Sequence, residues 1–121
     1  MRMIGYVRCS TDWQTVMQPI DALRAVGCKP IFRDKAVRAT AKNRPALQRL
    51  RKALKPGDTL VVTAIDRAFR STFEVIGFLD ELINEGIIFR SLAQYIDTRT
   101  PEGRQWYIDA TNSAEYERAV I

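Results

Sequence analysis

Two periodicities of hydrophobic residues divide the chain into alternating segments. Short apolar runs bounded by turn residues indicate buried strands, and the clearest of them is the β-branched stretch TLVVTAI. Such runs predict strands at residues 2–9, 30–34, 59–65, 87–92 and 95–97. Because the longer runs are continuously apolar, we expect these strands to be covered on both faces of a sheet.

Apolar residues at helical spacing fill the segments between the predicted strands. They predict helices at 19–26, 45–54 and 71–85, and a last helix that runs from Thr100-Pro101 to the end of the sequence. Gly27 is expected to end the first of them in a left-handed conformation. Pro19 is placed in the first turn of its helix, because inside the helix it would remove a backbone donor. Residues 11–18 are therefore expected to form a loop. Strands that alternate with helices predict an α/β fold with a mainly parallel sheet.

Length and composition indicate one domain with its own hydrophobic core, since the chain has 121 residues of which 46% are hydrophobic. No apolar run approaches the roughly 20 residues that a membrane-spanning helix needs. The five uncharged residues between Arg2 and Arg8 are too few for the apolar part of a signal peptide. Cys9 and Cys28 have no metal-ligand spacing and are too few for a disulfide framework. We therefore expect a cytoplasmic protein without membrane contact.

Positive charge is concentrated in one part of the chain, although the net charge is only +5. Between Arg24 and Lys55 there are eleven cationic side chains and a single acidic one, Asp34, so the remaining residues sum to −5. Arginine outnumbers lysine fourteen to five, and its planar guanidinium suits bidentate contacts with phosphate. This distribution favours a polyanionic partner.

The first strand ends in the sequence YVRCST, which places Arg8 and Ser10 two residues apart. In an extended chain, side chains at i and i+2 point to the same face, so Arg8 and Ser10 are expected to stand side by side. A strand that merely frays into a polar turn is the simpler interpretation of these six residues alone. The rest of the chain favours a site, because ligands of parallel sheets gather at the carboxyl ends of the strands.

A second predicted strand end supplies further charged groups. The TLVVTAI strand leads into Asp66, Arg67 and Arg70, and the two arginines are three residues apart, so they share one face of a helical turn. Arg44 begins the helix after the basic loop, where its charge opposes the helix dipole unless an anion is shared. Four arginines around Ser10 form a pattern typical of a phosphate-binding site.

The residue types present exclude several reaction classes. The sequence has no histidine, which excludes a Ser-His-Asp hydrolase. It also lacks a GxxxxGK[ST] phosphate loop and any metal-ligand cluster. A serine hydroxyl can still attack a phosphodiester if fixed cations meet the developing negative charge.

Several short motifs recur in the order and spacing of one protein family. They are YVRCST, ALRAVGC, FRDKA, NRPALQRL, DRAFR, GIIFRSL, IDTRTPEGR and AEYER. With them, the chain resembles the catalytic domain of the serine site-specific recombinases, which include resolvases and DNA invertases, over nearly its whole length. The resemblance implies a mixed, mostly parallel five-stranded sheet with helices on both faces and a long C-terminal helix.

The resemblance also implies a role for individual residues. Ser10 is the expected nucleophile, which attacks the DNA backbone, forms a transient 5′-phosphoserine bond and releases a 3′-hydroxyl. The expected catalytic partners of Ser10 are Arg8, Arg44, Asp66, Arg67 and Arg70. The residues expected to bind DNA or its phosphates are Gln18, Arg38, Lys42 and Arg118. Neither a metal nor another cofactor is implied, because the phosphoserine conserves the energy of the broken bond.

The implied partners are DNA and further copies of the chain. Dimers are expected to form through the last helix and to pair into tetramers at synapsis. The protein is expected in the cytoplasm, associated with the nucleoid. Trp106 and Tyr107 diverge by about 100° around a helix, which also favours a partner subunit on that helix. Residues 1–121 are interpreted as a catalytic domain whose last helix is truncated and whose helix-turn-helix DNA reader is absent. Such a chain is expected to bind DNA weakly, through phosphates, and not to recombine efficiently alone.

Two other functions remain open from the residues alone. In the first, Asp34 and Asp66, with Asp58, bind magnesium for nuclease chemistry; the excess of arginine and the single Ser10 argue against it. In the second, the chain is a non-catalytic dimerisation module of the same fold, against which the retention of Ser10 and every arginine speaks.

Overall fold

Strands and helices alternate along the chain in the computed structural model, which describes residues 2–9, 13–35, 44–68 and 72–120. The strands are β1 (Met3–Cys9), β2 (Ile31–Lys35), β3 (Thr59–Val62), β4 (Ile88–Ser91) and β5 (Ile96–Asp97). The helices are α1 (Trp13–Ala25), α2 (Pro45–Ala53), α3 (Ile65–Ala68), α4 (Thr72–Asn84) and α5 (Pro101–Val120). Each predicted strand and helix is present, and α3 is an additional short helix.

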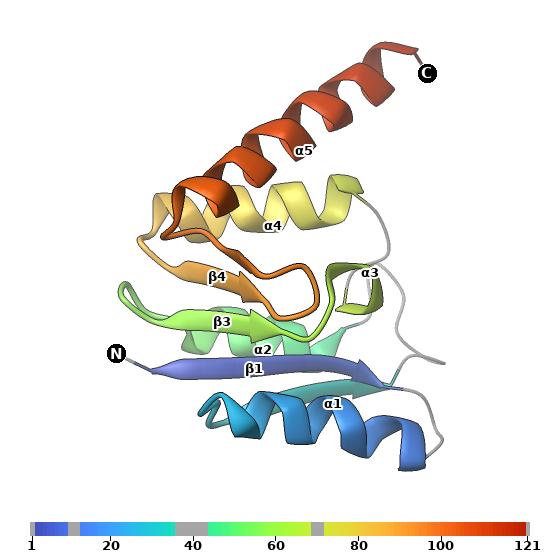
Figure 1. Ribbon diagram of the computed structural model, residues 1–121, viewed down its shortest axis with the longest axis vertical. Helices are drawn as coiled ribbons and strands as arrows, with labels where there is room; N and C mark the ends of the chain where they lie inside the picture. Colours follow the sequence, from blue (N-terminus) through green and yellow to red (C-terminus); the bar gives the residue numbers. More distant parts are fainter. Residues whose placement is uncertain (1, 10–12, 36–43, 69–71, 121) are drawn as a thin grey trace.

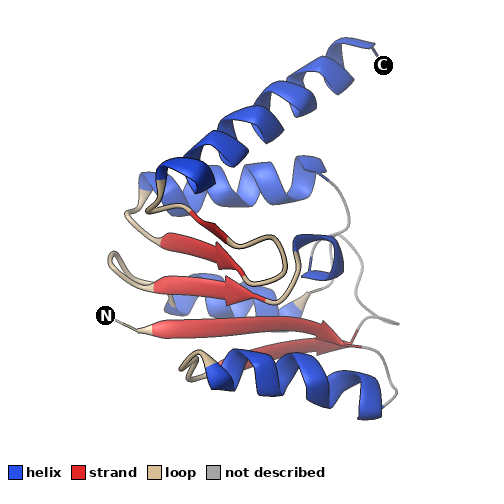
Figure 2. Ribbon diagram, viewed as in Figure 1, coloured by secondary structure: helices blue, strands red, loops and turns tan. Residues whose placement is uncertain are grey.

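The strands form one twisted sheet in the order β2-β1-β3-β4-β5 (Figures 1 and 2). β1 pairs in parallel with both β2 and β3, and β3 pairs in parallel with β4. Only β5 is antiparallel, because it returns from β4 through a tight turn. The predicted fold class, a mixed and mostly parallel sheet of five strands, is therefore confirmed.

Helices cover both faces of the sheet, as the continuous apolar strands predict (Figure 1). On one face, Ile20 and Leu23 of α1 pack against Val7 and Val61. On the other face, α2, α4 and the start of α5 bury a larger cluster that includes Tyr6 and the fully buried strand residues around it. Neighbouring strand residues such as Tyr6 and Val7 enter opposite clusters because side chains alternate along a strand. No helix within the described residues is long and apolar enough to cross a membrane.

The start of α1 differs from the sequence prediction. The helix begins at Trp13, so Pro19 lies inside it and residues 13–18 are not a loop; residues 11–12 lie outside the described residues. A proline within a helix removes one backbone hydrogen bond and crowds the carbonyl four residues earlier, but the preceding residues can still adopt helical angles. The end of α1 is as predicted: Gly27 has φ +97°, and its N–H and that of Cys28 bond the carbonyls of Arg24 and Leu23.

The strand predicted at 59–65 is shorter in the structure. β3 ends at Val62, and Ile65 already begins α3. The β-branched composition of the whole stretch suits a strand, but only residues up to Val62 have a partner in the ladder with β4. The chain therefore turns directly after the sheet and places Asp66 and Arg67 on a helical turn close to its edge.

α5 is anchored at its first turn and then leaves the body of the molecule (Figure 1). Thr100 caps the helix, since its Oγ1 accepts a hydrogen bond of 3.0 Å from the Gly103 N–H. Trp106, Tyr107 and Ala110 are partly buried against the larger cluster of the same chain, whereas the sequence analysis used Trp106 and Tyr107 to favour a partner subunit. Ile108, on another side of the helix, is 50% exposed.

Candidate active site

The ends of three parallel strands meet at one edge of the sheet, which we call the carboxyl edge. Val62 of β3 lies between Tyr6 of β1 and Ser91 of β4 in the ladder. Residues that follow these positions therefore emerge side by side, with about 5 Å between neighbouring strands. Ligands of open α/β sheets bind at this edge.

Arg8 stands at the end of β1, next to Asp34 of β2 in the parallel register. Its side chain is partly buried, and its Nε atom is buried with no hydrogen-bond partner among the described residues. A buried N–H group without a partner is unfavourable, and a phosphate oxygen is a suitable acceptor for it. Ser10 lies outside the described residues, so its expected position beside Arg8 stays a prediction.

A buried polar network lies beneath Arg8. The Tyr6 hydroxyl donates a hydrogen bond of 2.9 Å to Asp34 Oδ2. The backbone N–H groups of Ala46 and Leu47 donate to the same carboxylate at 2.8 and 3.1 Å. Asp34 thus caps the N-terminus of α2 from another element, where its charge also complements the helix dipole. Burial, together with the hydrogen bond to Asp34, raises the pKa of Tyr6 above its ordinary value, so the phenol stays protonated and donating.

Arg44 connects this network to α3. It is the residue before α2, its side chain is only 3% exposed, and its Nη1 donates to the Ala68 carbonyl at 3.2 Å. Arg44 and Arg8 both lie close enough to Tyr6 to lower its pKa electrostatically, against the larger effect of burial. The sequence places the positive charge of Arg44 at the N-terminus of a helix, where it opposes the helix dipole. The carboxylate of Asp34 lies at the same helix end and compensates this repulsion.

The structure places the remaining predicted site residues only in part. Asp66 and Arg67 are on α3, Gln18 is on α1 and Arg118 is on α5, but their side chains lie outside the part that is described. Arg38, Lys42 and Arg70 lie outside the described residues altogether. The described residues thus bring Arg8, Arg44 and α3 together and leave the other positions as predictions.

Tyr6 is a site residue that the sequence analysis missed, and Asp34 has a different role from the one considered. The signal for Tyr6 was present, because the alternation of side chains along a strand puts residue 6 on the same face as residue 8. Asp34 entered only as a magnesium ligand, whereas its oxygens accept hydrogen bonds from Tyr6, Ala46 and Leu47.

Asp58 does not belong to the carboxyl edge. It precedes β3 and accepts hydrogen bonds from the Arg2 side chain at 2.7 Å and the Lys55 N–H at 2.9 Å. The hydrogen bond from Arg2 is the main cause that lowers the pKa of Asp58. Because Asp58 and Asp34 lie at opposite ends of the strands, they cannot share a metal ion. Within the described ranges, no cluster of three or more His, Cys, Asp or Glu residues is arranged for a metal.

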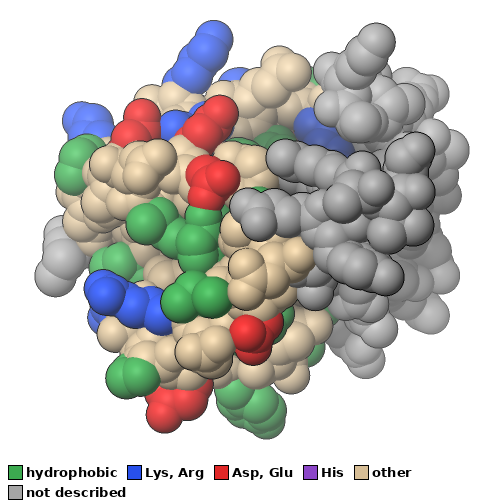
Figure 3. Space-filling model, turned by 90° about the horizontal axis from the view of Figure 1, so that it is seen from above, with side chains coloured by type: hydrophobic (Ala, Val, Ile, Leu, Met, Phe, Trp, Pro, Cys, Tyr) green, Lys and Arg blue, Asp and Glu red, His purple; other side chains and the backbone are tan. Residues whose placement is uncertain are grey.

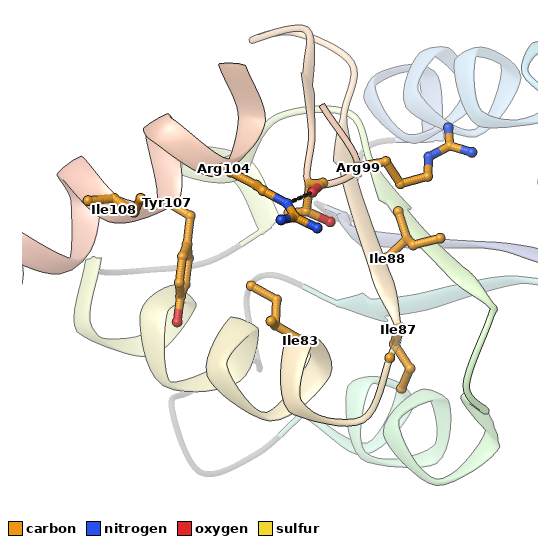
Figure 4. A pocket seen from close by; sticks show the side chains of 9 residues that line it. Ile83, Ile87, Ile88, Arg99, Arg104, Tyr107 and Ile108 are labelled. Atoms are coloured by element: carbon orange, nitrogen blue, oxygen red, sulfur yellow. Dashed lines mark hydrogen bonds between the residues drawn. The ribbon is translucent and has the colours of Figure 1, made fainter. Parts of the chain in front are cut away.

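A cavity of about 400 Å³ lies at the other edge of the sheet, between α4, β4 and α5 (Figure 4). Ile83, Ile88, Tyr107 and Ile108 give it an apolar lining. At its rim, Arg104 Nε donates to the Thr98 carbonyl at 3.3 Å. Since β4 begins at this edge, the cavity is separate from the carboxyl edge and from Arg8.

Comparison with models of known protein families assigns the chain to one of them. Residues 3–121 match the family model described as "Resolvase, N terminal domain". The chain belongs to the resolvase family. The family resemblance seen in the motifs is thereby confirmed, and it covers nearly the whole chain of this resolvase-family protein.

Its relatives include enzymes that are named for DNA rearrangement. A DNA-invertase of Escherichia phage P1 is 44% identical over 119 residues, which are 98% of this chain and 63% of the relative. The serine recombinase gin of Escherichia phage Mu is also 44% identical over 119 residues, 98% of this chain and 61% of the relative. The resolvase-family chain thus spans about three-fifths of the length of these curated relatives.

Solved structures agree with the fold of this family member. The N-terminal catalytic domain of TP901-1 integrase superposes with a TM-score of 0.80 at 26% identity, covering 99% of this chain and 98% of that one. A resolvase-family site-specific recombinase from Streptococcus pneumoniae has a TM-score of 0.76 at 18% identity, covering 98% and 89% of the two chains, and supports the fold alone.

Replacing Asp34 by alanine is expected to lower the free energy of unfolding by about 3 kcal/mol. The change leaves the Tyr6 hydroxyl and two N–H groups at the start of α2 without their acceptor. Urea unfolding measures the loss, and Tyr6→Phe is the matched control, because it removes a single hydrogen bond worth about 1 kcal/mol. Equal losses in the two variants would show that Asp34 does not hold α2.

Proposed function

We propose that the chain cleaves and rejoins DNA strands as the catalytic part of a site-specific recombinase. The observation that carries the proposal is the family match over residues 3–121, on a chain whose carboxyl edge presents Arg8 and Arg44. The proposal treats residues 1–121 as a resolvase-like catalytic domain, and the chain spans about three-fifths of the length of its curated relatives.

Ser10 is the proposed nucleophile. Its Oγ attacks a DNA phosphorus atom, so an Oγ–P bond forms while the bond from phosphorus to the 3′ oxygen breaks. The serine hydroxyl loses its proton, and the departing 3′ oxygen takes one up. The product is a 5′-phosphoserine linkage and a free 3′-hydroxyl. Attack by a 3′-hydroxyl on this linkage reverses the step and rejoins DNA, with one ester bond exchanged for another and no ATP consumed.

Arginines are proposed to stabilise the charge that develops on the phosphate oxygens. At about 4 Å and an effective dielectric constant near 20, one guanidinium contributes roughly 4 kcal/mol before desolvation is subtracted. Half of that amount corresponds to about thirtyfold in rate. Arg8, Arg44, Arg67 and Arg70 together therefore suffice for the stabilisation that other phosphoryl-transfer enzymes obtain from magnesium. Asp66 is proposed to orient these arginines.

DNA and further copies of the chain are the proposed partners. Gln18, Arg38, Lys42 and Arg118 are proposed to bind the DNA backbone. α5 is proposed to form the dimer interface, with tetramers at synapsis. Support comes from Ile108, which is 50% exposed, and from the hydrophobic side chains that show among charged ones on the α5 side of the molecule (Figure 3).

A covalent protein–DNA adduct formed in EDTA is the result expected from this chemistry. The protein is mixed with a nicked duplex that traps the cleaved strand, and the products are separated on a denaturing gel with EDTA or with Mg²⁺. A band of protein-linked DNA in both conditions supports serine transfer. Cleavage only with Mg²⁺ and without an adduct would contradict it and favour a metal-dependent nuclease. Absence of both products would favour the non-catalytic module.

A further inference from the structure

The turn between β4 and β5 carries a tyrosine that the fold does not use. Tyr95 is 93% exposed, the highest exposure among the large hydrophobic residues that the structure describes as exposed. Its backbone has φ +52°, a left-handed conformation that is unfavourable for a residue with a Cβ atom. An aromatic ring held in water on a strained backbone gains little from folding, and such outliers are found at functional sites.

The turn is fastened to the strand end that leads into α3. The Leu92 N–H donates to the Val62 carbonyl at 3.0 Å, and the Ala93 N–H donates to the Thr63 carbonyl at 2.8 Å. The Tyr95 N–H closes the turn on the Leu92 carbonyl at 3.3 Å. Tyr95 is therefore displayed by a fixed turn, only a few residues from the point where the chain enters α3.

A polar group accompanies the ring. The hydroxyl of Ser91, which is fully buried, donates to Gln94 Oε1. This contact occupies the carbonyl side of the Gln94 amide, so its Nε2 group, on an exposed side chain, remains to donate outward. The turn thus offers a flat apolar face together with a hydrogen-bond donor.

The position of the turn relates it to Arg8. β1, β3 and β4 are consecutive in the sheet and parallel, so the turn after β4 and the end of β1 lie at the same edge. Two strand spacings, about 10 Å, separate these strands. At about 3.4 Å per nucleotide step, that distance is roughly three nucleotides along a DNA strand.

From this arrangement we infer that Tyr95 and Gln94 form a nucleobase-binding platform beside the proposed cleavage site. Tyr95 stacks on a base of the DNA strand whose phosphate lies at Arg8, and the Gln94 amide donates to that base or its phosphate. Stacking on an aromatic side chain accepts any base, so the platform contributes affinity and strand position rather than sequence specificity. The inference rests on the proposed function in one respect, that DNA is the ligand of this edge.

Binding of a fluorescein-labelled single-stranded oligonucleotide, followed by anisotropy over a series of salt concentrations, tests the platform. Tyr95→Asn removes the ring and suits a left-handed backbone, so it should fold as well as the wild type. We expect this variant to bind about tenfold more weakly at every salt concentration, with an unchanged slope of log K against log salt, because no phosphate contact is lost. Tyr95→Phe, which keeps the ring, should bind like the wild type.

Ile83→Gln is the matched control, because Ile83 is an exposed hydrophobic residue at the opposite edge. It should leave DNA binding unchanged. An oligonucleotide that contains 5-iodouracil should also form a photo-crosslink to Tyr95 that is identified by mass spectrometry. If wild type binds DNA but Tyr95→Asn binds within about twofold of it, the platform is wrong while the proposed function stands. If the wild type binds no DNA even at low salt, both are wrong.

Tyr95 could instead contact a second copy of the chain, and the same variants distinguish this role from DNA binding. Sedimentation of wild type and Tyr95→Asn without DNA measures it. A shift toward smaller species in the variant, with DNA binding unchanged, would overturn the platform in favour of a protein interface.

Discussion

Replacing Ser10 by alanine is expected to reduce formation of the covalent protein–DNA adduct by at least about a thousandfold. The hydroxyl is the proposed attacking group, and loss of a nucleophile removes nearly all of the catalysis that depends on it. Binding of DNA without reaction is expected to persist, because the arginines that are proposed to hold the phosphate remain. Adduct is measured on denaturing gels in EDTA, and binding is measured by anisotropy on the same DNA.

Thr11→Ala is the matched control for this experiment, since it removes the neighbouring hydroxyl from the sequence YVRCST. It should form adduct at close to the wild-type rate. If the adduct persists in Ser10→Ala and disappears in Thr11→Ala, the nucleophile is Thr11, and the proposal for Ser10 is wrong. Loss of DNA binding in Ser10→Ala would mean that the variant reports on binding and not on chemistry.

Replacing Gly103 by alanine is expected to destabilise the protein by about 3 kcal/mol. Gly103 is buried in the first turn of α5, and a Cβ atom there would lie 2.0 Å from the carbonyl oxygen of Asp97 and 2.5 Å from its carbonyl carbon. Both contacts are with backbone, so α5 or β5 has to move, and overpacking of this kind is costly. Helix propensity alone predicts the opposite, a gain of about 1 kcal/mol for alanine.

Gly77→Ala separates these two effects. Gly77 lies in the middle of α4, is exposed, and has nothing within 4 Å of the position of a Cβ atom. This variant is expected to gain between about 0.5 and 1 kcal/mol. Urea unfolding of both variants is the measurement. If Gly103→Ala were as stable as Gly77→Ala, the first turn of α5 would not be packed against Asp97 as tightly as described.

The position of α5 also bears on the proposed function. Arg118 and the proposed dimer interface are both on this helix, while Ser10 and Arg8 are on the sheet or follow it. A displaced α5 in Gly103→Ala is therefore expected to weaken self-association, which sedimentation measures, even where the sheet remains folded.

Much of the fold and part of the site could be predicted from local sequence. Continuous apolar runs identified the strands, and Gly27 identified the end of α1, because these signals act within a few residues. The apolar run before Arg8 predicted its position at the end of the first strand, which is confirmed, whereas its expected place beside Ser10 stays a prediction. The family could be predicted as well, since its motifs are preserved in order within the linear sequence.

Other features depended on segments that are far apart in the sequence. Asp34 caps α2 and accepts a hydrogen bond from the Tyr6 hydroxyl only because β1 and β2 lie side by side under that helix. The tight contact of Gly103 with Asp97 spans only six residues, but it depends on how the first turn of α5 packs on β5, which no periodicity of the sequence predicts. Likewise, the turn that carries Tyr95 is near α3 only through its hydrogen bonds to the end of β3.

The sequence by itself determined the elements, their order and the family, because backbone preferences and hydrophobic periodicity are local properties of the chain. Tertiary structure decided which polar groups share a buried network, where proline is accepted inside α1, and which exposed groups stand at the same edge. The physical reason is that a buried hydrogen bond or a backbone contact needs two partners. Which partners meet is determined by the packing of whole elements and not by either residue alone.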